Sequence, residues 1–432
     1  MIRRRQALLL AGMLAAGPGP AAAQSWLETR ISIEELAEAG DYAAAAELSD
    51  RLLEQVAAEF GDVSPDYADS LMLLAEVDLG DFEFLRAEGR VYSAIGIFRE
   101  LEGPNSPSLI EPYVLLGELL YADGAHTPAL EAFEEARLLT RRELGLFNQD
   151  QLAILAKMTH TALSSGDRDL ALDLQDEAVS IVGRSYGTDS IEYVGAILDQ
   201  ADWLARVGDR RGATQIRYSL HGVVNDFPED RPSLTVSALR EIARRSLLTT
   251  RYDPLPPREL TRALKIVDGL EPPDPVLHAS VLKDIADWHF AMRSLDEADA
   301  ALAAAWAILD QAKGGQEIQQ EWFGEPEIIR ASALMPSPMV ARALTTGTNA
   351  PGGQVELEFE VLTSGRASGI RVVGSNPPGL VDDAAIQSIE RSSFRPAMAG
   401  GEAVVATRRF IWNFHYHPDR VQDLSASFRR SD

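Results

Sequence analysis

The sequence predicts a multidomain protein in which an array of helix pairs is followed by a small α+β domain. Two observations predict this fold class. Glycines recur every 42 residues through the first half of the chain, and strand-like alternation replaces helical spacing near its C-terminus. With 432 residues and a hydrophobic fraction of 46%, the chain is long enough to build more than one core. It has no cysteine, which excludes disulfides and thiolate zinc sites.

Residues 1–23 are typical of a secretory signal peptide. Arg3, Arg4 and Arg5 precede ten apolar residues, half of the roughly 20 that span a bilayer. The small residues that follow predict cleavage between Ala23 and Gln24. We therefore expect export to a periplasm, by the Sec or the twin-arginine route. The alternative is a retained segment that anchors the protein in the inner membrane.

Acidic residues dominate the chain, whose formal net charge is −26. The entire excess lies in 25–326, with 55 acidic and 26 basic side chains. Such a surface repels nucleic acids and anionic lipid headgroups, so neither is an expected partner. A solvated helix surface is the simpler explanation of the charge, and attraction of a basic partner is the alternative.

Two interleaved glycine series define the repeat. One has equal steps of 42 residues and consists of Gly61, Gly103, Gly145 and Gly187. The other has steps of 40, 44, 42 and 42 and consists of Gly40, Gly80, Gly124, Gly166 and Gly208. Chance placement of 32 glycines would not produce two series of the same period.

The unit at 109–144 is the clearest and predicts two helices. Gly124 is expected to end the first helix with a positive φ, and Gly117 to let the second approach closely. The second helix carries one packed face, and the corresponding face recurs in the next unit. The predicted packing residues of these helices are Gly117, Gly124, Ala129, Phe133, Ala136, Ala171 and Ala178. The unit around Gly80 departs from the pattern, with Leu85 where a small residue is expected, and 211–275 interrupts it.

This pattern resembles tetratricopeptide repeats over about 30–310, in a 42-residue form similar to the repeats of kinesin light chain. The resemblance implies a solenoid of stacked helix pairs, here placed at 24–312, whose concave groove binds peptides or protein segments. An array that serves only as a spacer or an assembly surface is the alternative.

The pattern changes after residue 312. A linker is predicted at 313–326, an α+β domain at 327–417 and a polar tail at 418–432. Apolar residues alternate with glutamates over 354–362, which predicts a half-buried strand. A hairpin turn, a second strand, a helix and a long aromatic-rich last strand complete the domain.

The order and spacing of these elements resemble the C-terminal domain of the TonB energy transducer family. The matching segments are Pro336 with Ala341-Arg342, 353–361, Gly365-Arg366, 375–378, 382–386 and Phe394-Arg395-Pro396. The resemblance implies a domain that adds an extended segment of an outer-membrane transporter to its sheet edge. Energy coupling fits the sequence less well, because repeats stand where a transducer has a long Pro-rich spacer.

In this family fold the last strand lies at a sheet edge, so we expect binding there. Its candidate contact residues are Thr407, Arg408, Arg409, Phe410 and Trp412. The arginines would meet acidic side chains, and the aromatic residues would shape a pocket. The alternative is an edge that is covered by the tail or by a second copy of the domain.

No constellation in the sequence predicts catalysis. The chain lacks a His-Glu-x-x-His motif and a phosphate loop, and neither a metal nor a cofactor is expected. The sequence therefore predicts a non-enzymatic adaptor or scaffold with protein partners. An atypical energy transducer that serves an outer-membrane transporter is the alternative. The partner's identity and the oligomeric state are left open.

Overall fold

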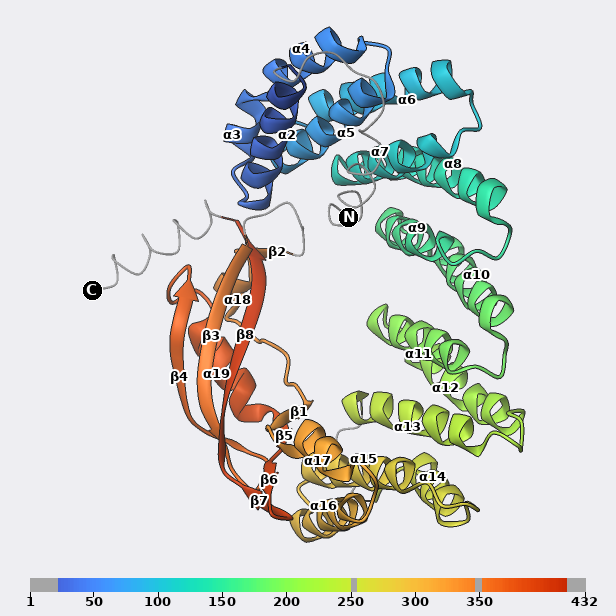
Figure 1. Cartoon of the computed structure of the whole chain (residues 1–432), viewed down its shortest axis with the longest axis vertical. Helices are drawn as coiled ribbons and strands as arrows, with labels where there is room; N and C mark the ends of the chain where they lie inside the picture. The colour runs from blue at the N-terminus through green and yellow to red at the C-terminus, as the bar shows by residue number, and fades with distance from the viewer. Residues whose placement is uncertain (1–21, 250–254, 346–351, 418–432) are drawn as a thin grey trace. The chain divides into compact units, whose positions relative to one another are not determined.

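A computed structural model describes residues 22–249, 255–345 and 352–417 (Figure 1). The chain forms two compact units, 1–175 and 176–432. Helix pairs build the first unit and the beginning of the second, which ends in a β-rich domain. The predicted fold class is confirmed.

The first unit consists of helices in antiparallel succession. They are α2 (Ala22–Glu38), α3 (Tyr42–Glu47), α4 (Ser49–Phe60), α5 (Pro65–Gly80), α6 (Phe84–Glu102), η2 (Pro107–Leu109), α7 (Ile110–Ala122), α8 (His126–Leu144), α9 (Gln151–Ser165) and the start of α10 (Arg168–Tyr186). The predicted pair at 109–144 corresponds to α7 and α8. An alanine Cβ at Gly117 would lie 2.5 Å from the Phe133 ring, which explains the glycine.

One glycine series behaves as predicted. Gly61, Gly103 and Gly145 follow α4, α6 and α8 with φ of 87°, 91° and 96°. With ψ of 158°, 170° and 163°, they adopt a backbone conformation that is almost restricted to glycine. Three residues after Gly61, the Ser64 hydroxyl accepts a hydrogen bond from the Tyr67 N–H at 3.2 Å and caps α5.

In the other series, one turn position was predicted two residues too early in the chain. Gly40, Gly124, Gly166 and Gly208 have positive φ, but Gly80 is the last residue of α5 and does not. The residue with positive φ at this turn is Phe82, with φ of 62°. With Phe82 in place of Gly80, all steps of the series are 42 residues. The residue equivalent to Ala129 is then Ala87, which is fully buried. Leu85, 86% exposed, was therefore wrongly aligned with the small-residue position. Gly80 is required instead by packing, because a Cβ there would overlap the Tyr42 ring.

The second unit continues the helix pairs through the region that was expected to interrupt them. After the end of α10 come α11 (Ile191–Arg206), α12 (Arg210–Asn225), α13 (Pro232–Thr249), α14 (Arg258–Asp268), α15 (Pro275–Met292), α16 (Leu295–Asp310) and α17 (Gly315–Phe323). Phe227, in the turn between α12 and α13, is buried with Val224 and Ile242. The prolines of this region lie at or between helix ends, so the stack is preserved.

The C-terminal domain has a four-stranded antiparallel sheet in the order β2-β8-β3-β4, covered on one face by α19. Its elements are β1 (Glu327–Arg330), α18 (Pro338–Ala341), β2 (Leu344–Thr345), β3 (Gly352–Val361), β4 (Ala367–Asn376), α19 (Asp382–Arg391), β5 (Ser393–Arg395), β6 (Ala397–Ala399), β7 (Glu402–Val404) and β8 (Ala406–Tyr416). As predicted from the alternation, Val355, Leu357 and Phe359 are buried in the core. The predicted tail lies outside the described residues.

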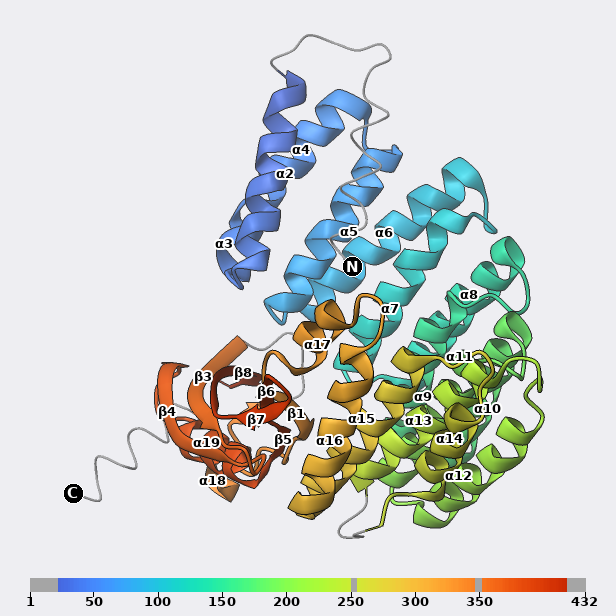
Figure 2. The ribbon, with the colours of Figure 1, turned by 60° about the horizontal axis from the view of Figure 1, so that its bottom comes forward.

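The segment 313–326, predicted to be a linker, is folded. It contains α17, which follows α16 and α15 in the ribbon (Figure 2). The fully buried Phe323 of α17 shares a core with Phe290 of α15 and Met398 of β6. The apolar residues of α17 span little more than two turns, too short a stretch for periodicity to identify. The array and the domain are therefore packed together within this unit.

Arg395 lies at the centre of this packing and is only 1% exposed. Its guanidinium donates to both carboxylate oxygens of Asp287 on α15, at 2.9 and 2.7 Å, and also pairs with Glu327 on β1. It also lies over the Phe323 ring, 5.7 Å from the ring centre. Two carboxylates and an aromatic face thus replace most of the water that this buried charge has lost, and its Nε–H has no acceptor among the described residues.

The left-handed turns generate a first prediction. Gly124→Ala should lower the free energy of unfolding by about 1 kcal/mol, since an alanine is strained at positive φ. Phe82→Gly should not lower it, because that change relieves the same strain at the equivalent position. Urea denaturation of both variants is the measurement. A destabilising Phe82→Gly beside a neutral Gly124→Ala would contradict the equivalence of the two positions.

The buried guanidinium generates a second prediction. Arg395→Met should destabilise the second unit by about 3–5 kcal/mol, because it removes one partner of a buried ion-pair cluster. The control is Arg371→Met, which removes an exposed arginine paired with Glu358 and should leave the melting temperature unchanged. Equal melting temperatures for the two variants would show that Arg395 does not hold the array and the domain together.

Candidate functional site

Strand β8, the predicted binding strand, is paired on one side and largely open on the other. It pairs with β3 along its whole length, from Gly352↔His415 to Val361↔Ala406. On its other side it pairs only with β2, at Leu344↔Tyr416 and Thr345↔His415. From 406 to 414, therefore, no strand within the described ranges covers this side of β8.

The hydrogen bonding next to β2 shows which backbone groups face the open side. The N–H of His417 donates to the Ala343 carbonyl oxygen at 2.8 Å, so residue 417 points its backbone groups toward β2. Backbone direction alternates along a strand, and β8 keeps a continuous register with β3. The N–H and C=O groups of Thr407, Arg409, Ile411 and Asn413 therefore point to the free edge.

The side chains of the candidate residues divide between the two faces of the sheet. Thr407 and Arg409 are exposed on the outer face. Arg408, Phe410 and Trp412 alternate with them, are partly buried and lie on the core side, where the two aromatic rings are 5.3 Å apart. Only one of the predicted pair of arginines thus lies on the same face as the aromatic residues.

The two arginines also differ in their partners. Arg409 donates to Glu358 at 2.9 Å and to Glu356 at 3.5 Å, so neighbouring carboxylates on β3 already neutralise it. Hydrogen bonds from Arg371 and Arg409 lower the pKa of Glu358 and keep it ionised. Arg408 is different, because burial lowers the pKa of its guanidinium and Glu325 offsets this only in part. Arg409 thus already has carboxylate partners within the chain, and binding of acidic side chains of a partner by either arginine stays a prediction.

The predicted repeat residues are packing residues. Ala129, Phe133 and Ala136 are buried along one face of α8, and Ala171 and the partly buried Ala178 occupy the equivalent positions of α10. Gly117 and Gly124 lie inside and just after α7. The predicted cleavage junction, Ala23–Gln24, lies within the first turn of α2.

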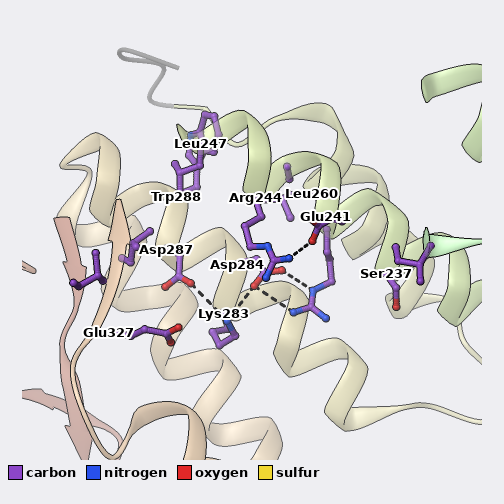
Figure 3. A pocket seen from close by; sticks show the side chains of 15 residues that line it. Ser237, Glu241, Arg244, Leu247, Leu260, Lys283, Asp284, Asp287, Trp288 and Glu327 are labelled. Atoms are coloured by element: carbon purple, nitrogen blue, oxygen red, sulfur yellow. Dashed lines mark hydrogen bonds and ion pairs between the residues drawn. The ribbon is translucent and has the colours of Figure 1, made fainter. Parts of the chain in front are cut away.

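The second unit contains a pocket of about 360 Å³ that was not predicted from the sequence (Figure 3). Helices α13, α14 and α15 form most of its wall together with β1. Its apolar wall includes Leu247, Leu260 and Trp288. Ion pairs cross its polar wall, with Arg240 donating to Asp284 at 2.6 Å and Lys283 lying 3.2 Å from Asp284.

One carboxylate in this pocket, Asp284, is held in its ionised form. Burial alone would raise the pKa of Asp284, but Lys283 and Arg240 outweigh burial and hold it below its usual value. Lys283 also lies 3.6 Å from Asp287, which accepts from Arg395. An acid or base catalyst needs a pKa near the working pH, so Asp284 is unsuited to that role. No group of His, Cys, Asp or Glu able to hold a metal ion occurs among the residues that the structure describes.

One feature of the sequence, a cluster of basic residues, could have indicated the part of the array that forms this pocket. Twelve of the chain's 40 Lys and Arg residues lie in 206–265, inside a repeat array that is acidic overall. Two of these arginines have partners on the first helix of a neighbouring pair, as in Arg240–Asp284 and Arg245–Asp202, which are 44 and 43 residues apart. The repeat period therefore brings these pairs together.

The pKa of Asp284 generates a third prediction. Asp284→Asn should destabilise the protein at pH 7, where the ionised carboxylate binds Arg240 and Lys283. The lowered pKa means that this stabilisation is complete above the ordinary pKa of 3.8 and is lost as the pH falls through the folded-state value. Urea denaturation from pH 7 to about pH 3 should show the difference from the unmodified protein shrinking. The control, Glu131→Gln on an exposed helix face, should show no difference at any pH.

Comparisons with known proteins identify the C-terminal domain. Residues 348–416 match the family model for the Gram-negative bacterial TonB protein C-terminal. The match covers β3, β4, β8 and α19, and it does not include β2 or the repeat array. No curated protein matches the chain. Within the described residues, no helix is both long enough and apolar enough to cross a membrane.

Several solved structures are similar to the repeat array. TPR-like repeats of a kinesin light chain from Podosopora anserina are 15% identical, with 48% of this chain and 97% of that chain covered and a TM-score of 0.40. BtubC from P. vanneervenii is 16% identical, with coverages of 68% and 94% and a TM-score of 0.30. Aspartyl phosphate phosphatase F from Bacillus subtilis is 13% identical, with coverages of 68% and 72% and a TM-score of 0.39.

The predicted combination of two parts is confirmed. Helix pairs with a 42-residue period build a tetratricopeptide-like array, and the family model matches the TonB C-terminal-like domain. Both parts are of kinds that bind other proteins and are generally not catalytic.

Proposed function

We propose that this protein is a non-enzymatic adaptor of the bacterial periplasm. The repeat array holds one protein, and the C-terminal domain holds an extended segment of a second protein by adding it to β8. Periplasmic location rests on the signal-like sequence at 1–23, of which residues 1–21 lie outside the described residues. The second partner would be an outer-membrane transporter or another protein of the cell envelope.

The free edge of β8 is the observation that supports strand addition. Four residues point their N–H and C=O groups outward, from Thr407 to Asn413, and nothing in the described ranges pairs with them. An extended peptide can satisfy these groups with main-chain hydrogen bonds, whatever its sequence. The neighbouring side chains then supply selectivity.

The alternative function, energy transduction, has less support. A transducer needs a long spacer ahead of this domain, whereas here α17 packs between the last repeat and β1. A folded helix of nine residues cannot extend across the periplasm. Adaptor function does not require such a reach.

Proline substitution tests strand addition. Ile411→Pro removes an N–H that points to the free edge, so it should remove one hydrogen bond to an added strand and leave the pairing with β3 in place. Capture of envelope proteins by the full-length protein, measured by cross-linking, should fall strongly. Ile411→Ala is the matched control, because it removes the same exposed side chain and keeps the N–H.

Circular dichroism of both variants shows whether the domain remains folded. Unchanged capture by a folded Ile411→Pro variant would mean that the partners are held elsewhere, by the repeats or by the pocket between α13, α15 and β1. Equal losses in Ile411→Pro and Ile411→Ala would assign the effect to the side chain and count against strand addition.

A further inference from the structure

Two buried hydrogen-bond donors on β8 have no partner among the described residues. They are the Nε–H of Arg408 and the Nε1–H of Trp412. Both atoms are hidden from solvent, although each side chain as a whole is only partly buried. A buried donor without an acceptor costs free energy, so each of these positions is left incomplete in the isolated chain.

The two donors have a regular arrangement along the free edge. Arg408 and Trp412 are four residues apart, so they lie about 13 Å from each other on the same face of the strand. Phe410 lies between them on that face, with its ring 5.3 Å from the Trp412 ring. Viewed along β8, the core-side face thus offers a donor, an apolar ring and a donor.

An added strand would place its own side chains next to these three residues. The backbone groups of Arg408, Phe410 and Trp412 point toward β3, so on the free-edge side these residues take non-hydrogen-bonded pairing positions. Side chains across such pairs lie close together. To donate to the new neighbour, the partly exposed Arg408 and Trp412 side chains must rotate about their outer χ angles.

We propose, building on strand addition at β8, that this edge selects a five-residue pattern in its partner. The pattern has a carboxylate opposite Arg408, an apolar side chain opposite Phe410 and a hydrogen-bond acceptor opposite Trp412, with any residue between them. The partner is thus an extended segment with acidic or acceptor side chains at its first and fifth positions and an apolar one at its third. The pairing positions used here are those of an antiparallel added strand.

The outer face of the same strand adds little selectivity. Arg409 is neutralised by Glu356 and Glu358, and Thr407 and Asn413 are exposed and small. Ile411 is half exposed, without other apolar residues directly beside it on β3, where its pairing partner is Glu356. The intervening positions of the peptide are therefore free to vary.

Two peptides of identical composition test the pattern with the full-length protein. The probe Thr-Asp-Thr-Val-Thr-Asp-Thr puts both acids on the face of the valine. The control Thr-Thr-Asp-Val-Asp-Thr-Thr puts them on the opposite face. With a fluorescent label and anisotropy as the readout, the probe should bind at least about tenfold more tightly, as expected for hydrogen bonds to a charged group.

Variants assign the effect to the two donors. Arg408→Met should remove most of the difference between the peptides, and Trp412→Phe should remove part of it with the ring retained. Arg409→Met, on the other face of β8, should leave the difference unchanged. Circular dichroism establishes that each variant is folded.

The outcomes separate the pattern from strand addition itself. Equal affinities of the two peptides, both lost in Ile411→Pro, would overturn the selectivity and leave strand addition standing. A preference for the probe that persists in both Arg408→Met and Trp412→Phe would also overturn it. Binding of neither peptide, or binding that is insensitive to Ile411→Pro, would contradict both proposals.

Discussion

The second unit depends on one buried charge, the guanidinium of Arg395. Removing such a group from water is costly, and the cost is offset here only because Asp287 comes from the array, Glu327 from β1 and the Phe323 ring from α17. The position of β5 therefore depends on contacts with three other elements, α15, β1 and α17. The family match begins at 348, after β1 and α17, so these two elements adapt a domain of known type to the end of a repeat stack.

The array depends on a different constraint, the left-handed turn that recurs every 42 residues. Glycine meets this constraint at most positions, whereas Phe82 and Arg293 meet it with φ of 62° and 64°. These two are the non-glycine residues with positive φ within the described ranges, and both end the first helix of a pair. A strained backbone conformation persists only where the surrounding structure holds it in place. Here the stacked neighbouring helix pairs hold the turns at Phe82 and Arg293.

Those two constraints explain which features the sequence could reveal. Period, helix pairs and the strands of the domain follow from glycine spacing and from alternation, which are local signals. The sequence could not show that the turn near Gly80 lies at Phe82. A glycine required by contact with Tyr42 is the same letter as a glycine required by positive φ. The pocket could not be predicted from these local signals either. Its Arg240–Asp284 pair depends on how far two side chains reach between neighbouring helix pairs.

Strand β8 shows how the same local signal can be right and still incomplete. Alternation predicts that Arg408, Phe410 and Trp412 share one face, and they do. It does not tell which backbone groups are left unpaired, because that depends on the strand order and on the contact of His417 with Ala343. Nor does it distinguish two adjacent arginines, of which β3 neutralises one with its glutamates and leaves the other a buried donor. Selectivity at this edge arises from that difference, since a partner can gain only from groups that the fold itself has not satisfied.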